Sequence, residues 1–456
     1  MTSVSAGDGP VPPPASPAGQ GPPPGEPSPA VAVGPPPAGQ GPAGLSPRAA
    51  LRRYVLVSFL AWLPSGLTFP VMVLLMSSHG LGLAQIGAVT AVHSVVVVVL
   101  ELPTGGLADV VGRRVVLAAS AALSMAALVL MATATTVWPF LGWAVLQGTA
   151  RALSSGPAQA WYVDTLHRAA GPDADLRHGL SRGEAAASFS LCLATLAGGF
   201  LPLAVPGGLI VPVLGGAVAA LVLLAVVLAV LREPPRPRPA LRAVLRDVPA
   251  TVGGGVGLAV RDGGLRRLLA IVFLAGVGLA VIELFTPGRL AALTGDAESG
   301  SSVYAVVAAA GFGASALGSW LSPWVARVLG RPSRAGVAGM AGVALAFAVL
   351  ASTAALTGAA GVVTAGAAYV LLFAGLAVAE VTRMSMMHER VESSRRATLM
   401  SVDSLQLQFG AALSAAGFGA LAGVTGPSLV WWLTASVTLV SALLYIRLPA
   451  ATPSRT

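Results

Sequence analysis

The chain has 456 residues, of which 55% are hydrophobic and only 10% are charged, and its formal net charge is +9. A soluble domain keeps roughly a quarter of its residues charged because its surface faces water. This composition, with a mean hydropathy of +0.80, therefore excludes a soluble globular protein. The basic excess does not predict nucleic-acid binding, because such proteins cluster their basic residues on a soluble face, whereas these arginines lie between hydrophobic segments.

The first 47 residues are rich in proline, glycine, alanine and serine, and the hexapeptide Pro-Ala-Gly-Gln-Gly-Pro occurs at 17–22 and again at 37–42. Such a segment buries too little apolar area to offset the entropy lost on ordering. It has neither the charged start nor the apolar stretch of a signal peptide. We therefore predict a disordered cytoplasmic tail over residues 1–50.

Beyond this tail, the hydrophobic runs are mostly about 18 or more residues long, the length with which an α-helix crosses roughly 30 Å of hydrocarbon. Strands of a membrane β-barrel would instead alternate over about ten residues. The sequence predicts an all-α, polytopic membrane protein with twelve transmembrane helices. Their predicted ranges are 54–76, 82–103, 115–135, 138–163, 184–205, 208–231, 268–287, 302–326, 335–354, 360–382, 397–422 and 427–447.

A polar segment with four prolines between residues 232 and 239 divides the helices into two equal sets. Proline at this density is incompatible with a membrane helix. The predicted domains are an N-terminal six-helix bundle at 51–231, a cytoplasmic linker at 232–267, a C-terminal six-helix bundle at 268–447 and a cytoplasmic tail at 448–456. Two equal halves indicate an internal duplication, which is common among transporters.

Arginines concentrate in alternate loops. The loops at 77–81, 135–137, 205–207, 355–359 and 424–428 contain none, whereas the intervening loops hold nearly all of them. Arg289 is the exception on the arginine-poor side. Because short cytoplasmic loops are enriched in Lys and Arg, the pattern predicts a multi-pass protein of the cell membrane with both termini in the cytoplasm.

The segment 101–114, ELPTGGLADVVGRR, ends the second predicted helix and leads into the third. Glycines here allow sharp turning and close packing, and we expect Asp109 to cap the third helix. The segment resembles the signature loop of the major facilitator superfamily, Gly-x-x-x-Asp-Arg/Lys-x-Gly-x-Arg/Lys, although Val110 replaces the usual basic residue. The predicted signature loop and gate residues are Glu101, Gly105, Asp109, Gly112, Arg113 and Arg114.

Further resemblances extend over nearly the whole chain after residue 50. Residues 80–87 are similar to the family's usual start of the second helix, and residues 155–164 and 395–401 resemble patterns of bacterial drug exporters. The resemblance implies two six-helix bundles that rock about a central cavity. The family's arginine before Gln-Gly in the fourth helix is absent, and we expect Arg151, one turn later, to substitute for it.

Charges inside a bilayer are costly and usually mark a transport pathway or a paired network. Glu283 lies deep in the seventh predicted helix, near an expected outer end at Pro287 and Gly288. Its carboxylate could carry a proton or bind a cationic substrate. It could equally be an interfacial or helix-pairing residue, and the sequence leaves both alternatives open.

Four other residues complete the coupling or substrate candidates. Arg151 needs a partner, for which Glu101 and Asp164 are candidates. His93 could relay protons or be a hydrogen-bonded structural residue. Asp164 and Asp403, near predicted cytoplasmic helix ends, are expected to join a gate network, beside a local Glu380–Arg383 pair.

No convincing enzyme site is present, and we predict no catalytic residue, metal or cofactor. Phosphate-binding and His-Glu-x-x-His motifs are absent, and Cys192 is the single cysteine. Residues 179–183 match the Gly-x-Ser-x-Gly pattern but lack the preceding strand that this motif requires.

The sequence thus predicts a secondary active transporter that works by alternating access. The leading expectation is proton-coupled efflux of a small amphipathic compound by a monomer in the lipid bilayer. Proton-coupled or facilitated uptake of a metabolite is the alternative, and a polytopic membrane enzyme or a channel is less consistent with the duplicated plan.

Overall fold

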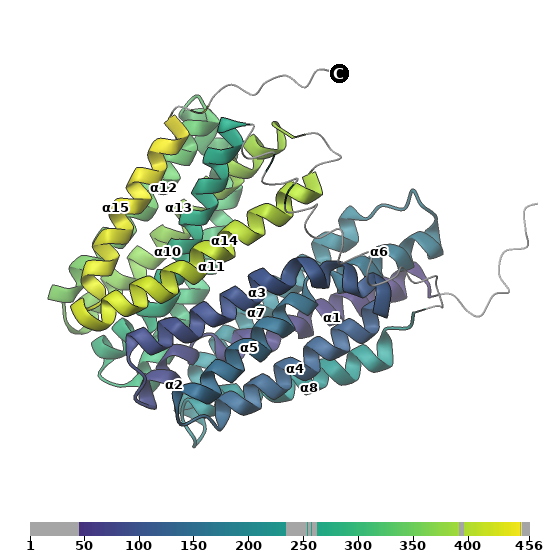
Figure 1. Ribbon diagram of the computed structural model, residues 1–456, viewed down its shortest axis with the longest axis horizontal. Coiled ribbons are helices and arrows are strands. Elements are labelled where there is room, and N and C mark those ends of the chain that lie inside the picture. The colour runs from purple at the N-terminus through teal and green to yellow at the C-terminus, as the bar shows by residue number, and fades with distance from the viewer. Residues whose placement is uncertain are drawn as a thin grey trace, which may run out of the picture. The chain divides into compact units, whose positions relative to one another are not determined.

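The computed structural model describes residues 45–233, 262–391 and 396–446, together with residues 253, 257 and 448. Within these ranges every regular element is a helix (Figure 1). Most of the predicted tail at 1–50, of the linker at 232–267 and of the tail at 448–456 lies outside the described residues.

The helices follow one another with short connections. The first half contains α1 (Pro47–Thr68), α2 (Met72–Ser78), α3 (Leu83–Val111), α4 (Arg113–Ala132), α5 (Val137–Ser154), α6 (Pro157–Ala170), α7 (Arg177–Ala204) and α8 (Ile210–Val230). The second half contains α10 (Gly263–Thr294), α11 (Ala297–Val328), α12 (Pro332–Ser352), α13 (Gly358–His388), α14 (Arg396–Thr425) and α15 (Pro427–Ile446), with a short 3₁₀ turn at Thr353–Ala355.

Eleven helical segments in the described residues are long and apolar enough to cross a membrane, and α1 with α2 counts as one of them. The fourth predicted span, α5, is not among the eleven because Gln147 and Arg151 lower its hydropathy. A helix nevertheless occupies each of the twelve predicted ranges. The all-helical membrane fold is confirmed, and the predicted count is close.

Two predicted spans are broken. In the first predicted span, α1 ends at Thr68 and α2 begins at Met72, beyond Pro70. The fourth was expected to be continuous over 138–163, which is wrong because Gly156 adopts φ +91° and ends the helix. This left-handed conformation suits glycine, and Pro157 starts the next helix without needing an N–H partner.

The seventh span, α10, is longer than the predicted 268–287. Its start is capped by Asp262, whose Oδ1 accepts hydrogen bonds from the N–H groups of Gly264 (2.7 Å) and Leu265 (3.2 Å). At the other end Pro287 lies inside the helix, which continues to Thr294. Glu283 therefore lies about 16 Å from the end of the helix rather than beside it.

Close helix pairs organise the described chain from Leu45 onward, which forms one compact unit. In the first half α1 packs on α7 and α8, and α4 packs on α5 and α8. In the second half α13 packs on α11 and α12, and α14 packs on α10.

Two further pairs, α3 with α14 and α7 with α11, join the halves. A Cβ atom at Gly87 would lie 2.9 Å from the Cα atom of Gly419, so these two helices touch through their backbones. On the other pair, the Ser301 hydroxyl donates to the Gly199 carbonyl (3.0 Å). Small residues permit this close packing in membranes, where helices have little hydrophobic drive to associate.

Candidate functional site

Glu283 is a charged residue well inside the membrane-spanning helix α10. Many protein atoms lie around this side chain, yet it retains exposed surface. Both observations hold together if the carboxylate faces an internal space that water reaches. Among the described residues no basic group pairs with it. The helix continues about 16 Å past Glu283, and the coupling and interfacial roles of this residue both stay predictions.

Two buried tyrosines lie close enough to Glu283 for its charge to act on both. The rings of Tyr304 and Tyr369 meet edge to face, with centroids 6.0 Å apart. Their hydroxyl groups interact with each other, but neither makes a well-formed hydrogen bond within the described residues, and the same holds for the Thr286 hydroxyl. Buried polar groups normally find partners, so these hydroxyls retain capacity to bind a ligand or water.

The two tyrosines belong to a closed ring of five aromatic side chains. Consecutive centroids are separated by 4.8 to 6.4 Å. In order around the ring they are Phe69, Tyr304, Tyr369, Phe373 and Phe312. Phe69 lies at the break between α1 and α2, whereas the others come from α11 and α13, so the ring joins the two halves.

Arg151 also combines enclosure by protein with an exposed side chain. Its guanidinium lies 4.8 Å from the ring centroid of Trp62, a cation–π arrangement. The carboxylate that acts on it is that of Glu101. Of the two partners considered from the sequence, Glu101 is therefore the one that the structure brings near.

Glu101 connects this group to the other half of the chain. Both of its carboxylate oxygens accept from the Ser404 hydroxyl of α14, at 2.9 and 3.1 Å. His93, on the same helix as Glu101, lies near Arg151 and stacks on Trp143, with centroids 6.0 Å apart. The three predicted residues Glu101, Arg151 and His93 thus form one cluster, separate from the other predicted carboxylates.

A second charged group forms where α3 meets α4. The Arg113 guanidinium pairs with Asp164 of α6 and, at 3.4 Å, with Asp109. It also donates to the carbonyl of Ala160. Asp164 therefore joins the signature residues.

The signature segment is a helix end, because α3 continues through Gly105 and Asp109 to Val111. The single connecting residue is Gly112, at φ +112°. Asp109 does not cap α4 as predicted. Instead, the carboxylate of Glu233 accepts from the Arg113 N–H at 2.8 Å, and Arg114 donates to the Leu228 carbonyl.

A third group is buried between α13 and α14. Arg383 donates to both oxygens of Glu380 (3.0 and 2.6 Å) and to both oxygens of Asp403, one of them at 3.0 Å. The local Glu380–Arg383 pair expected from the sequence is present. Asp403, a predicted coupling candidate, is 7% exposed and fully engaged by Arg383.

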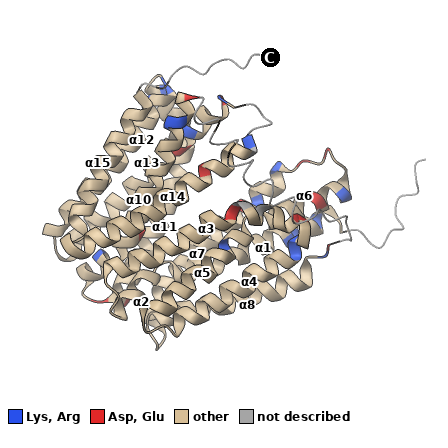
Figure 2. Ribbon diagram, in the orientation of Figure 1, with Lys and Arg blue, Asp and Glu red and all other residues tan. Residues whose placement is uncertain are grey.

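Sequence reasoning missed Tyr369, Ser404 and Glu233. Their roles arise from contacts between segments that are distant in the sequence. Glu233 stands at the start of a Pro-rich segment, and nothing in that pattern predicts that it caps α4. Figure 2 shows that most charged residues lie near helix ends, which sets the few internal ones apart. In the described residues no group of three His, Cys, Asp or Glu side chains could hold a metal ion.

Comparison with known proteins agrees with this architecture. The family model of the Major Facilitator Superfamily matches residues 54–382. The nucleoside transporter NupG is similar in structure, with TM-scores of 0.73 for a point mutant and 0.71 for the unmutated protein. Each is 16% identical and covers 87% of this chain, which in turn covers 99% and 98% of them.

A D-xylose–proton symporter is similar with a TM-score of 0.67 and 14% identity, covering 90% of this chain and 99% of its own. No curated protein sequence matches the chain. The structural matches show a common fold, and the family match spans well over half of the sequence. The chain is a member of the major facilitator superfamily, a multi-pass membrane transporter.

Proposed function

We propose that the protein takes up a small polar metabolite together with protons, by alternating access, and that Glu283 carries the proton. The observation that carries the proposal is a carboxylate in mid-helix that has many protein atoms around it, retains exposed surface and has no basic partner in the described residues. An ionisable group in a membrane span that lacks a counter-charge is costly. Proton binding removes that cost.

The coupling follows from this electrostatic argument. A protonated Glu283 is neutral, so the helices around it can close on the loaded site with little penalty. A deprotonated Glu283 favours states in which water still reaches it. Proton binding therefore biases the equilibrium between conformations, as a coupled ligand must.

The site chemistry favours a substrate with a ring and several hydrogen-bonding groups. The hydroxyls of Tyr304, Tyr369 and Thr286 have unused hydrogen-bonding capacity. The partly exposed rings of Phe69, Phe312 and Phe373 supply aromatic surface beside them. The similar structures are, by their names, a nucleoside transporter and a sugar–proton symporter. These findings favour uptake over the efflux of an amphipathic compound, which rests on short exporter-like motifs.

The direction of transport depends on orientation. The charged groups around Arg113 and Arg383 lie at the ends of helices whose adjoining loops are rich in arginine. We place these ends in the cytoplasm and the protein in the cell membrane, in accord with the enrichment of arginine in cytoplasmic loops.

The proposal is tested with the full-length protein in liposomes. Nucleosides, pentoses and hexoses are offered under an imposed inward proton gradient, beside a panel of amphipathic dyes and antibiotics. We expect gradient-driven accumulation of at least one polar compound. Export of a dye with no accumulation of any polar compound would refute uptake and restore the efflux expectation.

A matched pair of variants then tests the assigned residue. Glu283→Gln removes the enclosed carboxylate, and Glu389→Gln removes an exposed one at the end of α13. Proton-driven accumulation should disappear in the first and persist in the second. Equal accumulation in both would exclude Glu283 as the proton carrier.

A further inference from the structure

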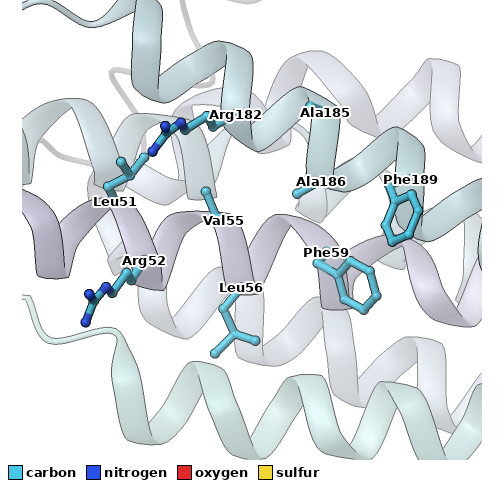
Figure 3. Close-up of a pocket in the computed structure, with 9 residues that line it drawn as sticks. All are labelled: Leu51, Arg52, Val55, Leu56, Phe59, Arg182, Ala185, Ala186 and Phe189. Carbon is cyan, nitrogen blue, oxygen red and sulfur yellow. The ribbon is translucent and has the colours of Figure 1, made fainter.

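A groove of about 630 Å³ lies between α1 and α7, outside the residues used in the proposed transport site. Nine residues from these two neighbouring helices line it (Figure 3). Two are arginines, Arg52 and Arg182, and the other seven are alanine, valine, leucine or phenylalanine. Its volume is in the range of small-molecule sites, but its polar groups all belong to the two guanidiniums.

Both arginines are free to bind an anion. Neither Arg52 nor Arg182 has an ion pair or side-chain hydrogen bond in the described part of the chain, and both side chains are exposed. Among the described residues, no carboxylate lines the groove. The nearest acidic residue along α7, Glu184, is outside the lining and acts on Tyr54. The groove therefore presents two positive charges without a counter-charge.

The charges and the apolar residues are separated along the membrane depth. Arg52 and Arg182 each lie five residues after the first residue of their helix, Pro47 and Arg177. Phe59 and Phe189 lie seven residues further along the same helices, which is about 10 Å deeper. Figure 3 shows the arginines toward one end of the groove and the phenylalanines at the other.

The apolar end is open to its surroundings. The side chain of Phe189 is 64% exposed and that of Leu56 is 42% exposed, and the rings of Phe59 and Phe189 lie 6.4 Å apart. A polar metabolite would find no hydrogen-bonding group along this part of the groove. A hydrocarbon chain would cover these residues, and a phosphate at its head would reach the arginines.

We propose that this groove is a binding site for an anionic phospholipid, with the phosphate at the end that carries Arg52 and Arg182 and an acyl chain against Leu56, Phe59 and Phe189. Basic pockets between membrane helices on the cytoplasmic side suit anionic head groups. The site depends on the membrane placement of α1 and α7 and is independent of the transported substrate. A bound lipid fixes α1 to α7 at their arginine-bearing ends.

The test measures lipid binding to the full-length protein in detergent, by native mass spectrometry and by thermal unfolding. Phosphatidylglycerol is titrated beside phosphatidylcholine of the same chain length. The double variant Arg52→Ala/Arg182→Ala should bind phosphatidylglycerol roughly 30-fold more weakly, because each arginine near an anionic lipid surface contributes about fivefold. Phosphatidylcholine binding should change little.

Two further variants separate a specific site from general charge and from anion binding. Arg327→Ala/Arg331→Ala removes two exposed arginines from the other half and should leave phosphatidylglycerol binding intact. Ala185→Trp fills the groove but keeps both guanidiniums, and should also weaken binding. Equal losses in both arginine pairs, or unchanged binding in Ala185→Trp, would overturn the proposal.

Glycerol 3-phosphate distinguishes a lipid from its head group. If it stabilises the protein as much as phosphatidylglycerol does, the groove binds a soluble anion and the lipid assignment is wrong. Size-exclusion chromatography and the unfolding temperature without lipid show whether each variant is folded. A variant that fails this check is replaced by Arg52→Gln or Arg182→Gln alone, for which we expect about a fivefold loss.

Discussion

Two carboxylates of the second half, Glu283 in α10 and Asp403 in α14, both lie within membrane helices but differ in their partners. Asp403 is bound through both oxygens by Arg383, which also holds Glu380. Glu283 faces two tyrosines and has no basic partner in the described residues. From this comparison we expect an acidic residue in a membrane helix to serve transport when its partners are incomplete, and to support the structure when they are complete.

The largest loss of stability is expected at Asp403, whose carboxylate is fully paired. Asp403→Asn leaves the Arg383 guanidinium with a single carboxylate, that of Glu380. Removing one partner of a buried ion pair typically costs 3–5 kcal/mol, and the remaining pair places the expected loss near the lower limit, at about 3 kcal/mol. Thermal unfolding in detergent measures it.

The matched variant is Glu380→Gln, which alters the more exposed carboxylate of the same group, with 43% of its side chain accessible. A smaller loss of stability is expected, because water screens this side of the pair. If Asp403→Asn is as stable as the unaltered protein but cannot transport, Asp403 belongs with Glu283 and the comparison fails.

Substitution of the tyrosines beside Glu283 should affect transport more than stability, in contrast to substitution of Asp403. Tyr304→Phe and Tyr369→Phe each delete a hydroxyl that has no well-formed hydrogen bond within the described residues. Stability should therefore change little, because no well-formed hydrogen bond is lost. The apparent affinity for the transported substrate should fall about fivefold if the hydroxyl binds it, as measured by concentration-dependent uptake.

A substantial loss of stability without a change in affinity would show that these hydroxyls support the protein. In that case the aromatic ring would remain as a packing element and the substrate site would lie elsewhere. Phe373→Leu provides the control, because it changes the ring without removing a polar group.

The smallest effect is expected at Asp296, an exposed carboxylate outside the membrane spans. Its pKa lies below the ordinary value because it accepts the backbone N–H of Ser299 at the start of α11. A depressed pKa contributes stability above about pH 4, the unfolded value, and loses it as the pH falls through the folded pKa. Asp296→Asn should slightly flatten the pH dependence of unfolding below pH 4, as measured by thermal unfolding over a pH series.

Much of the fold follows from the sequence because length and apolarity are strong signals for membrane helices. Each predicted range contains a helix, and the signature segment lies at the junction of α3 and α4 as expected. The end of α10 was misplaced because Pro287 and Gly288 resemble a helix terminus. In a membrane protein, neighbouring helices allow proline within a span.

The site was only partly predictable for a different reason. Glu283 and Arg151 were recognisable because charge in an apolar helix is conspicuous. Tyr369 and Ser404 were not, because only the packing of α13 on α11 and of α14 on α3 gives them their neighbours. Sequence spacing likewise does not show whether a carboxylate such as Asp403 is paired with an arginine.

The most direct test of Glu283 compares two modes of transport in the same liposomes. Proton-driven accumulation requires the proton carrier, whereas exchange of labelled for unlabelled substrate at equal pH requires only binding and conformational change. We predict that Glu283→Gln loses proton-driven accumulation but retains exchange. Accumulation that persists in Glu283→Gln would contradict the account, and loss of both modes would make Glu283 a substrate-binding or structural residue.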